Sequence, residues 1–112
     1  MGKVVFICTD TIGRGDEALG RKLMASFLYS LARTEPRPEA VLLMNAGVRL
    51  ACNASPVLDD LRLLVEDGVA VKACGTCLDY YGLKDALAVG EVGNMNDTAA
   101  AFMRANDVVT IA

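Results

Sequence analysis

The stretch that decides the fold runs from residue 69 to residue 82. It reads Val69-Ala70-Val71-Lys72-Ala73, followed by Cys74-Gly75-Thr76-Cys77-Leu78-Asp79-Tyr80-Tyr81-Gly82. The first five residues are typical of a short strand, and a short helix over roughly residues 77–82 is predicted to follow. Two cysteines separated by two residues therefore lie where a strand ends and a helical turn begins. At such a position the peptide dipoles favour the thiolate, the form of cysteine that attacks sulfur or binds metal.

Four further strands are predicted around this stretch, at residues 3–8, 40–44, 107–111 and, as a short strand, 87–89. The run at 3–8 and the segment 40–44 are almost wholly apolar, which is typical of strands covered on both faces, as in a parallel sheet. Between the longer runs, apolar residues recur at spacings of three and four, which indicates amphipathic helices. Strands that alternate with helices predict an α/β fold in which helices cover both faces of a mostly parallel sheet.

Capping residues mark where the helices begin and end. Asp16 is expected to cap the first helix, Ser55-Pro56 to begin the second and Gly68 to end it in a left-handed conformation. Asn96 or Asp97 is expected to cap the last helix. The expected packing residues are Leu19, Leu23, Met24, Phe27, Leu28 and Leu31 in the first helix, Leu58, Leu61, Leu64 and Val65 in the second, and Ala99, Ala100 and Met103 in the last.

The edge at which the strands end is the expected binding edge, because parallel α/β sheets bind ligands beyond the carboxyl ends of their strands. Three loops are expected there, over residues 9–16, 45–53 and 74–82. Residues 91–96 form a fourth if residues 87–89 are a strand.

Length and composition fit one domain. A chain of 112 residues buries roughly two-thirds of its unfolded surface, which is enough for a single core. The apolar fraction of 54% and the mean hydropathy of +0.37 are high, so we expect some apolar surface to meet another subunit in a homo-oligomer. The net charge of −3 and the pI of about 4.8 argue against nucleic acid or an anionic membrane as a partner.

The N-terminal segment and the cysteine content indicate in which cellular compartment the protein is found. No apolar run approaches the ~20 residues of a membrane helix, and Lys3 leads into a strand-like run without the layout of a signal peptide. We therefore expect a cytoplasmic protein, in which thiols stay reduced. Four cysteines in that compartment indicate chemistry or packing rather than a disulfide framework.

The cysteine pair has two interpretations. Cys74 or Cys77 is a reactive thiolate that accepts a sulfur atom, which the other cysteine can resolve as a disulfide, or both are small buried residues in a tight turn. The position at a strand end favours the reactive interpretation and leaves open which cysteine attacks. Cys8 and Cys52 are interpreted as packing residues. Only one cysteine pair is local and the chain has no histidine, so we expect no metal and no other cofactor.

A second group of residues is a candidate for binding a substrate or a small anion. Gly13, Arg14 and Gly15 precede a helix, where backbone N–H groups and a guanidinium suit an anion, although the same residues also suit a solvated turn. Asn45, Gly75 and Thr76 are expected near the thiols, and Asn45 is equally typical of a turn. The sequence offers no histidine for hydrolytic acid–base chemistry.

Four motifs occur in order over nearly the whole chain. They are Gly13-Arg14-Gly15-Asp16 with Leu19-Gly20, Asn45-Ala46-Gly47-Val48-Arg49-Leu50, Cys74 to Leu83, and Val89-Gly90-Glu91-Val92 with Asn94-Met95. This set resembles the DsrE-like family, and most closely the DsrE-like domains of the YedF family of sulfurtransferase-like selenium-metabolism proteins.

The resemblance implies a three-layer α/β/α sandwich with a five-stranded sheet. It also implies a sulfur (or selenium) relay in which a cysteine of the CxxC motif carries sulfane sulfur as a persulfide. It further implies a dimer, trimer or hexamer and a sulfur-carrier partner, such as a TusA-like protein. YedF proteins usually carry an N-terminal TusA-like domain, whereas this chain has no Cys-Pro carrier motif, so we expect a single DsrE-like domain over residues 1–112.

Two other functions fit the same residues. One is a non-catalytic oligomeric module that binds a sulfur-carrier protein or a small anion, with structural cysteines. The other is a dithiol redox switch. Whether the protein is an enzyme, with sulfurtransferase-like activity, stays open at this point.

Overall fold

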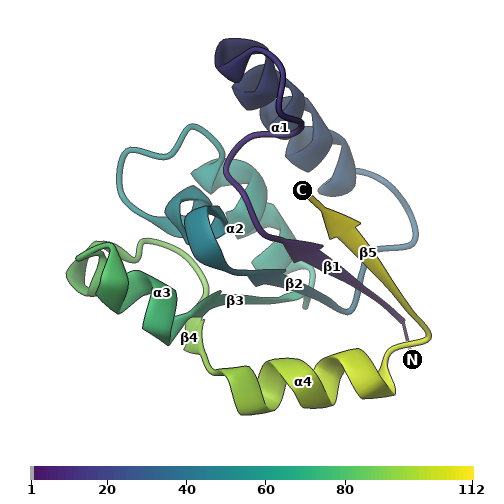
Figure 1. Ribbon diagram of the computed structural model, residues 1–112. Coiled ribbons are helices and arrows are strands. Elements are labelled where there is room, and N and C mark those ends of the chain that lie inside the picture. Colours follow the sequence, from purple (N-terminus) through teal and green to yellow (C-terminus); the bar gives the residue numbers. More distant parts are fainter. Residues whose placement is uncertain (1) are drawn as a thin grey trace.

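Five strands form one sheet in the computed structural model, which describes residues 2–112 (Figure 1). The strands are β1 (Lys3–Ile7), β2 (Ala40–Leu43), β3 (Ala70–Cys74), β4 (Glu91–Gly93) and β5 (Asp107–Ile111). Their order is β4-β3-β2-β1-β5, and every neighbouring pair is parallel. The predicted α/β fold with a parallel five-stranded sheet is therefore confirmed.

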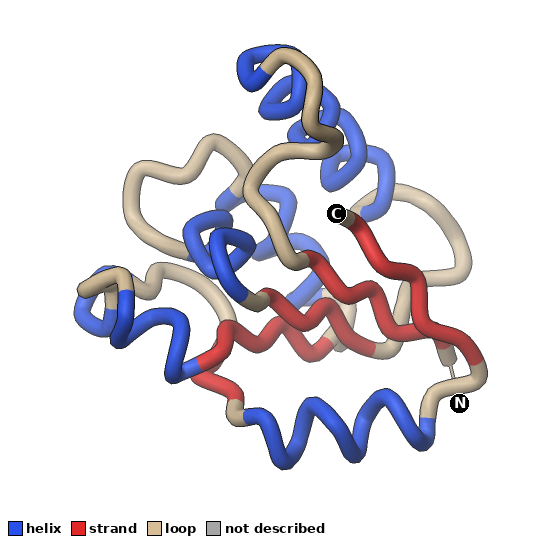
Figure 2. The backbone as a smooth tube through the Cα atoms, in the orientation of Figure 1, coloured by secondary structure: helices blue, strands red, loops and turns tan. Residues whose placement is uncertain are grey.

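Helices lie on both faces of this sheet. The α-helices are α1 (Glu17–Leu31), α2 (Leu58–Glu66), α3 (Gly75–Tyr80) and α4 (Met95–Arg104), and two 3-10 helices are η1 (Asn45–Ala51) and η2 (Lys84–Ala86). Helices α1 and α2 cover one face and α4 covers the other, while α3 extends from the end of β3 (Figures 1 and 2). No helix within residues 2–112 is both long and apolar enough to cross a membrane.

The alternation of side chains along the strands divides the core in two. On the α1/α2 face, Val5 and Ile7 of β1 pack with Met24 and Leu28 of α1 and with residues of α2 and η1. On the other face, Val4 and the β2 residues Ala40 and Leu42 form a smaller cluster against Ala101, Phe102 and Ala105. The α4 face is therefore covered by a single helix.

Two predicted helix ends are confirmed. The Asp16 carboxylate accepts the N–H of Leu19 at 2.9 Å at the start of α1, and Gly68 has a φ of +90° just after α2. Two others were wrong. The Ser55 hydroxyl accepts the N–H of Val57 and holds a turn, while α2 itself begins at Leu58. Asn94, rather than Asn96 or Asp97, caps α4, because its side chain accepts the N–H of Asp97 at 2.8 Å.

The apolar stripes of α1, α2 and α4 were partly wrong. Leu19, Leu23 and Val65 are largely exposed, although Met24, Leu28, Leu61 and Leu64 are buried as predicted. Helix α4 faces the sheet with Thr98, Ala101, Phe102 and Ala105, so Ala99, Ala100 and Met103 point to solvent. The spacing of apolar residues does not identify the buried side of a helix when apolar residues also line its outer side.

The fourth strand was predicted too early in the chain. Leu87 makes only an isolated antiparallel bridge with Cys52, and β4 begins at Glu91, where Lys72 and Glu91 pair in register. An edge strand with one neighbour is largely exposed and needs no apolar run. The helix predicted over residues 77–82 also begins earlier, at Gly75.

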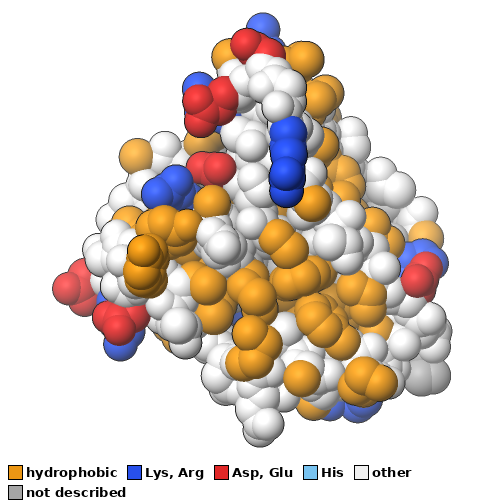
Figure 3. All heavy atoms as spheres, viewed as in Figure 1, with side chains coloured by type: hydrophobic (Ala, Val, Ile, Leu, Met, Phe, Trp, Pro, Cys, Tyr) orange, Lys and Arg blue, Asp and Glu red, His pale blue; other side chains and the backbone are white. Residues whose placement is uncertain are grey.

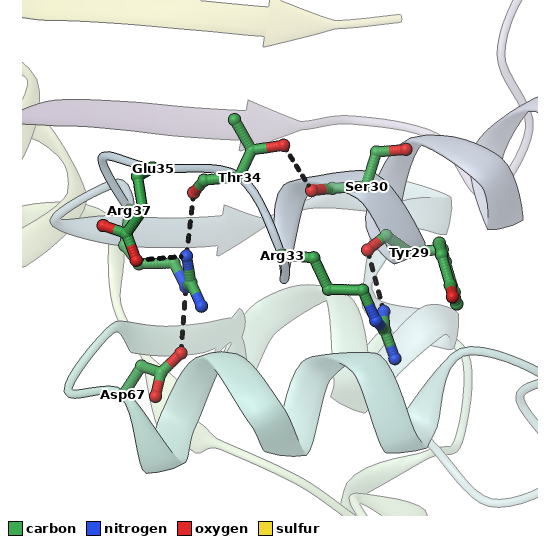
Figure 4. Close-up of polar contacts among 7 residues, drawn as sticks. All are labelled: Tyr29, Ser30, Arg33, Thr34, Glu35, Arg37 and Asp67. Carbon is green, nitrogen blue, oxygen red and sulfur yellow. Dashed lines mark hydrogen bonds and ion pairs between the residues drawn. The ribbon is translucent and has the colours of Figure 1, made fainter.

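Arginines fix the connection from α1 to β2 (Figure 4). Arg33 donates to the Tyr29 carbonyl at 2.8 Å, and Arg37 donates to the Thr34 carbonyl and the Asp67 carboxylate, both at 2.9 Å. These side chains use their guanidinium donors inside the fold, which links the end of α1 to the end of α2.

Candidate functional site

The candidate site lies where β2 and β3 end. Strand β2 leads through Met44 into η1, which begins at Asn45, and β3 ends at Cys74, directly before α3. Because neighbouring parallel strands end at the same edge of the sheet, η1 and the first turn of α3 meet there. Two of the three predicted loops, 45–53 and 74–82, therefore come together.

Cys77 lies in the first turn of α3 and touches the start of η1. Its Sγ accepts the backbone N–H of Asn45 at 3.1 Å. The Tyr81 hydroxyl donates to the Asn45 side-chain oxygen at 2.7 Å. Asn45 has a φ of +53°, a left-handed conformation that asparagine tolerates better than most residues. Asn45 is therefore held by both its backbone and its side chain, with its N–H directed at a sulfur atom.

Cys74 is the second thiol of the site. It is 7% exposed and belongs to the main core cluster, whereas Cys77 is half-buried at the edge of that cluster. The two thiols are neighbours, and both are free. The pair combines one accessible thiol with one sheltered thiol.

The pKa of the Cys77 thiol is raised, chiefly because burial penalises the thiolate. The N–H of Asn45 acts in the opposite direction and lowers the pKa, while the neighbouring Cys74 raises it further. This direction differs from the sequence-based expectation, in which a helix start favours the thiolate. The cost of removing a charge from water outweighs the hydrogen bond from one N–H group.

Tyr81 also connects the thiols to a cation that the sequence did not single out. The guanidinium carbon of Arg49 lies 4.4 Å from the centroid of the Tyr81 ring, in the range of a cation–π contact. Cys77 lies on α3 and Tyr81 directly after it, four residues on, a spacing that indicates one side of an α-helix. Asn45 and Arg49 belong to the 3-10 helix η1, in which residues four apart do not share a side, so the sequence carried no signal that brings them to Tyr81.

The remaining predicted residues lie at different places. Gly75 packs so closely that an added Cβ would lie 3.0 Å from a methyl carbon of Val92, and Thr76 is exposed. Gly13, Arg14 and Gly15 are exposed in the turn before α1, which Figure 1 shows well apart from α3. The structure therefore groups Asn45, Cys74 and Cys77 and leaves the glycine turn elsewhere.

The other two cysteines lie outside this pair. Cys8 follows β1 and is half-buried, while Cys52 is buried and donates to the Val48 carbonyl at 3.3 Å. Burial raises the pKa of both thiols. Within residues 2–112, no group of three Cys, Asp or Glu side chains is arranged to hold a metal ion.

Comparison with known proteins places the fold among solved structures. YchN from E. coli superposes with a TM-score of 0.73 at 22% identity over 99% of this chain and 100% of that one. MTH1491 from Methanobacterium thermoautotrophicum, a protein of unknown function, gives 0.69 at 22% identity over 98% and 99%. BT1422 from Bacteroides thetaiotaomicron, also of unknown function, gives 0.63 at 14% identity over 98% and 95%.

Similarity at these identities shows the fold alone. No curated protein sequence matches the chain. A family model described as DsrE/DsrF-like matches residues 3–111, which is nearly the whole chain. The chain therefore belongs to the DsrE/DsrF-like family.

Proposed function

We propose that the protein is a sulfur (or selenium) relay protein of the YedF-like type, which carries sulfane sulfur on Cys77 as a persulfide. The observation that carries this proposal is the N–H of Asn45 at 3.1 Å from the half-buried sulfur of Cys77. The membership of the DsrE/DsrF-like family supports it, as does the second free thiol beside Cys77.

The proposed step is an exchange at sulfur with a persulfide donor. The Cys77 thiolate attacks the terminal sulfur of the donor, an S–S bond forms to Cys77, and the donor's own S–S bond breaks. The donor leaves as a thiolate, so the terminal sulfur moves without net oxidation or reduction. An acceptor thiolate then attacks the terminal sulfur on Cys77 and restores the cysteine thiolate.

Cys77 rather than Cys74 is the proposed carrier because it is the more accessible thiol. The N–H of Asn45 would offset part of the negative charge on the Cys77 sulfur during attack and release. In this proposal, the Cys74 thiolate attacks the inner sulfur of the persulfide. That step forms a Cys74–Cys77 disulfide and releases hydrosulfide, which ends the carrier state.

Incubation of the reduced protein with glutathione persulfide, followed by intact mass and peptide mapping, tests the proposal. We expect one added sulfur on the peptide that contains Cys77. Cys77→Ser should abolish this adduct, while Cys8→Ser should retain it and Cys74→Ser should retain it for longer. An adduct that survives Cys77→Ser, or no adduct on Cys77 in the wild type, would contradict the proposal. The selenium-containing analogue of glutathione persulfide tests whether Cys77 accepts selenium in place of sulfur.

A second function is favoured by a separate observation, the apolar surface on and beside α4. Val92 is 55% exposed, Met95 is 58% exposed and Met103 is 84% exposed, and Figure 3 shows apolar side chains gathered around α4. This surface supports a homo-oligomer that acts as a binding module for a sulfur-carrier protein, such as a TusA-like one. A Cys74→Ser/Cys77→Ser protein that binds a TusA-like carrier with unchanged affinity would favour this function over the relay.

A further inference from the structure

A cavity of about 320 Å³ is lined by Cys52 and by neither thiol of the Cys74–Cys77 pair. Its walls come from α1, from the end of η1 and the loop that follows, and from Leu83. A cavity of this volume is in the range that holds small organic molecules. The residues that line the cavity determine which chemical class of ligand fits it.

Most of the wall is apolar. Met24 and Ala25 contribute from α1, Leu50 from η1, and Val57 and Leu83 from the segments that follow. Met24 and Val57 belong to the main core, so this part of the wall is fixed. These residues suit the aliphatic body of a ligand rather than a strongly hydrated ion.

The charged lining is mainly cationic. Arg21 and Arg49 both line the cavity, together with the single acid Asp10, and Asn53 and Ser55 are the uncharged polar residues there. Arg49 lies 3.9 Å from the Asp10 carboxylate, and Arg21 lies 3.4 Å from that of Glu17, which does not line the cavity. The three charged residues that line the cavity sum to one positive charge, and Glu17 beside Arg21 brings the local sum to zero, so each arginine has one carboxylate neighbour.

Both guanidiniums keep donors free. Within residues 2–112, neither Arg21 nor Arg49 donates a side-chain hydrogen bond, whereas Arg33 and Arg37 donate to carbonyls and carboxylates of the fold (Figure 4). A guanidinium carries five N–H donors in a planar fork that matches a carboxylate or a sulfonate. Arg21 and Arg49 are thus suited to an anion from outside the chain.

The backbone of the cavity wall supports the same conclusion. Ala54 lines the cavity and has a φ of +72°, and the other non-glycine residue with positive φ within residues 2–112 is Asn45. Alanine has no side-chain hydrogen bond to compensate for this conformation, which residues keep only where their surroundings impose it and which is concentrated at ligand sites. Both residues lie in the connection between β2 and α2.

We propose that this cavity binds a small organic monoanion, a carboxylate or sulfonate on a branched aliphatic body. Arg21 and Arg49 take the anionic head, and Met24, Leu50 and Val57 cover the aliphatic part. This site is distinct from the proposed persulfide carrier and does not depend on it. A neutral ligand of the same shape leaves both guanidiniums without a partner and binds less tightly.

Titration of the ¹⁵N-labelled protein, followed by amide chemical shifts, tests the proposal with three probes of similar shape. These are 4-methylpentanoate, 3-methylbutane-1-sulfonate and the neutral 4-methylpentanamide. We expect at least one anion to bind with a dissociation constant on the order of 1 mM. The shifts should be largest in residues 49–57 and around Ala25. The amide should bind roughly tenfold more weakly.

Matched variants separate this cavity from general anion binding. Arg21→Gln and Arg49→Gln should each weaken the better anion by roughly tenfold. Arg62→Gln, which changes an arginine on α2 that does not line the cavity, should leave it unchanged. Ala25→Leu should block binding by filling the space. The proposal is overturned if neither anion saturates below about 20 mM, if the amide binds as well, or if Arg62→Gln weakens binding as much as Arg21→Gln.

Discussion

The backbone N–H of Asn45 and the sulfur of Cys77 are 3.1 Å apart, although 32 positions separate the two residues in the sequence. The contact joins the end of β2 to the end of β3 and makes one site from two loops. It depends on the left-handed backbone of Asn45, with a φ of +53°, and on the Tyr81 hydroxyl that donates to the Asn45 side chain. This relationship can be tested at the backbone and at the side chain separately.

Asn45→Ala should destabilise the protein by about 1–2 kcal/mol, because alanine is strained in the left-handed region and the Tyr81 hydroxyl loses its acceptor. Asn45→Gly loses the same acceptor but adopts positive φ freely, so its loss should be clearly smaller. Urea unfolding monitored by circular dichroism measures both. Equal losses in the two variants would show that the backbone conformation of residue 45 has no energetic importance.

The reactivity of Cys77 should rise with pH well beyond neutrality. Its pKa is raised by burial and by Cys74, so the thiol is mainly protonated at neutral pH and the reactive thiolate accumulates only as the pH approaches the raised value. The alkylation rate with iodoacetamide should therefore increase without a plateau below about pH 8.5, the ordinary value for a cysteine. Quenched samples analysed by peptide mass spectrometry give this rate.

Glutathione, measured over the same pH range, serves as the model thiol for that experiment. At neutral pH, Cys77 should react more slowly than this model, because both its burial and its raised pKa act in that direction. An alkylation rate of Cys77 that is already constant near pH 7 would mean that the helix start favours the thiolate. Burial would then not be the dominant influence on the pKa of Cys77.

Gly47 holds η1 against β1, and its substitution should be severe. An added Cβ at Gly47 would overlap the carbonyl oxygen of Ile7, which is backbone and cannot move aside easily. Gly47→Ala should therefore lower the free energy of unfolding by about 1–3 kcal/mol or more. Gly15→Ala is the matched control, since its added Cβ would meet nothing within 4 Å, and it should stay within about 0.5 kcal/mol of the wild type. Thermal or urea unfolding of both variants checks the difference.

The strands that the sequence predicted well each contain at least three apolar residues, although they also include Lys3, Lys72, Asp107 and Thr110. The predictions at 3–8, 40–44, 69–73 and 107–111 match β1, β2, β3 and β5 to within one residue at each end. The edge strand β4 escaped prediction because Glu91 and Val92 are exposed and follow no apolar pattern. β5 is also an edge strand and is mostly exposed, but Val108, Val109 and Ile111 are typical strand residues, whereas the three-residue β4 has only Val92.

The site was predictable only in its local part. The CxxC spacing singled out Cys74 and Cys77, but the contacts of Cys77 with Asn45, and of Tyr81 with Asn45 and Arg49, depend on how η1 and α3 meet. The direction of the Cys77 pKa was missed for a related reason. A helix start can be identified from sequence, whereas the burial that outweighs it depends on the whole fold.

The exposed outer side of α4 leads to a prediction about assembly. Met103 is 84% exposed and lies on the side of α4 opposite to Ala101 and Ala105, which pack on the sheet. If this side joins subunits, Met103→Lys should lower the oligomeric mass in sedimentation equilibrium at micromolar concentration, because a buried lysine at the interface would lack a partner. The stability of the single subunit should change little, since an exposed side chain contributes little to the core.

Leu19→Lys provides the matched control for the assembly experiment. Leu19 is 53% exposed on α1, which covers the other face of the sheet, so the same type of substitution there should leave the mass unchanged. A wild-type protein that sediments as a monomer would contradict the assembly, and a mass that falls equally in both variants would place the contact elsewhere. Loss of mass in Met103→Lys alone would assign the subunit contact to α4, on the face of the sheet away from the Arg21 and Arg49 cavity.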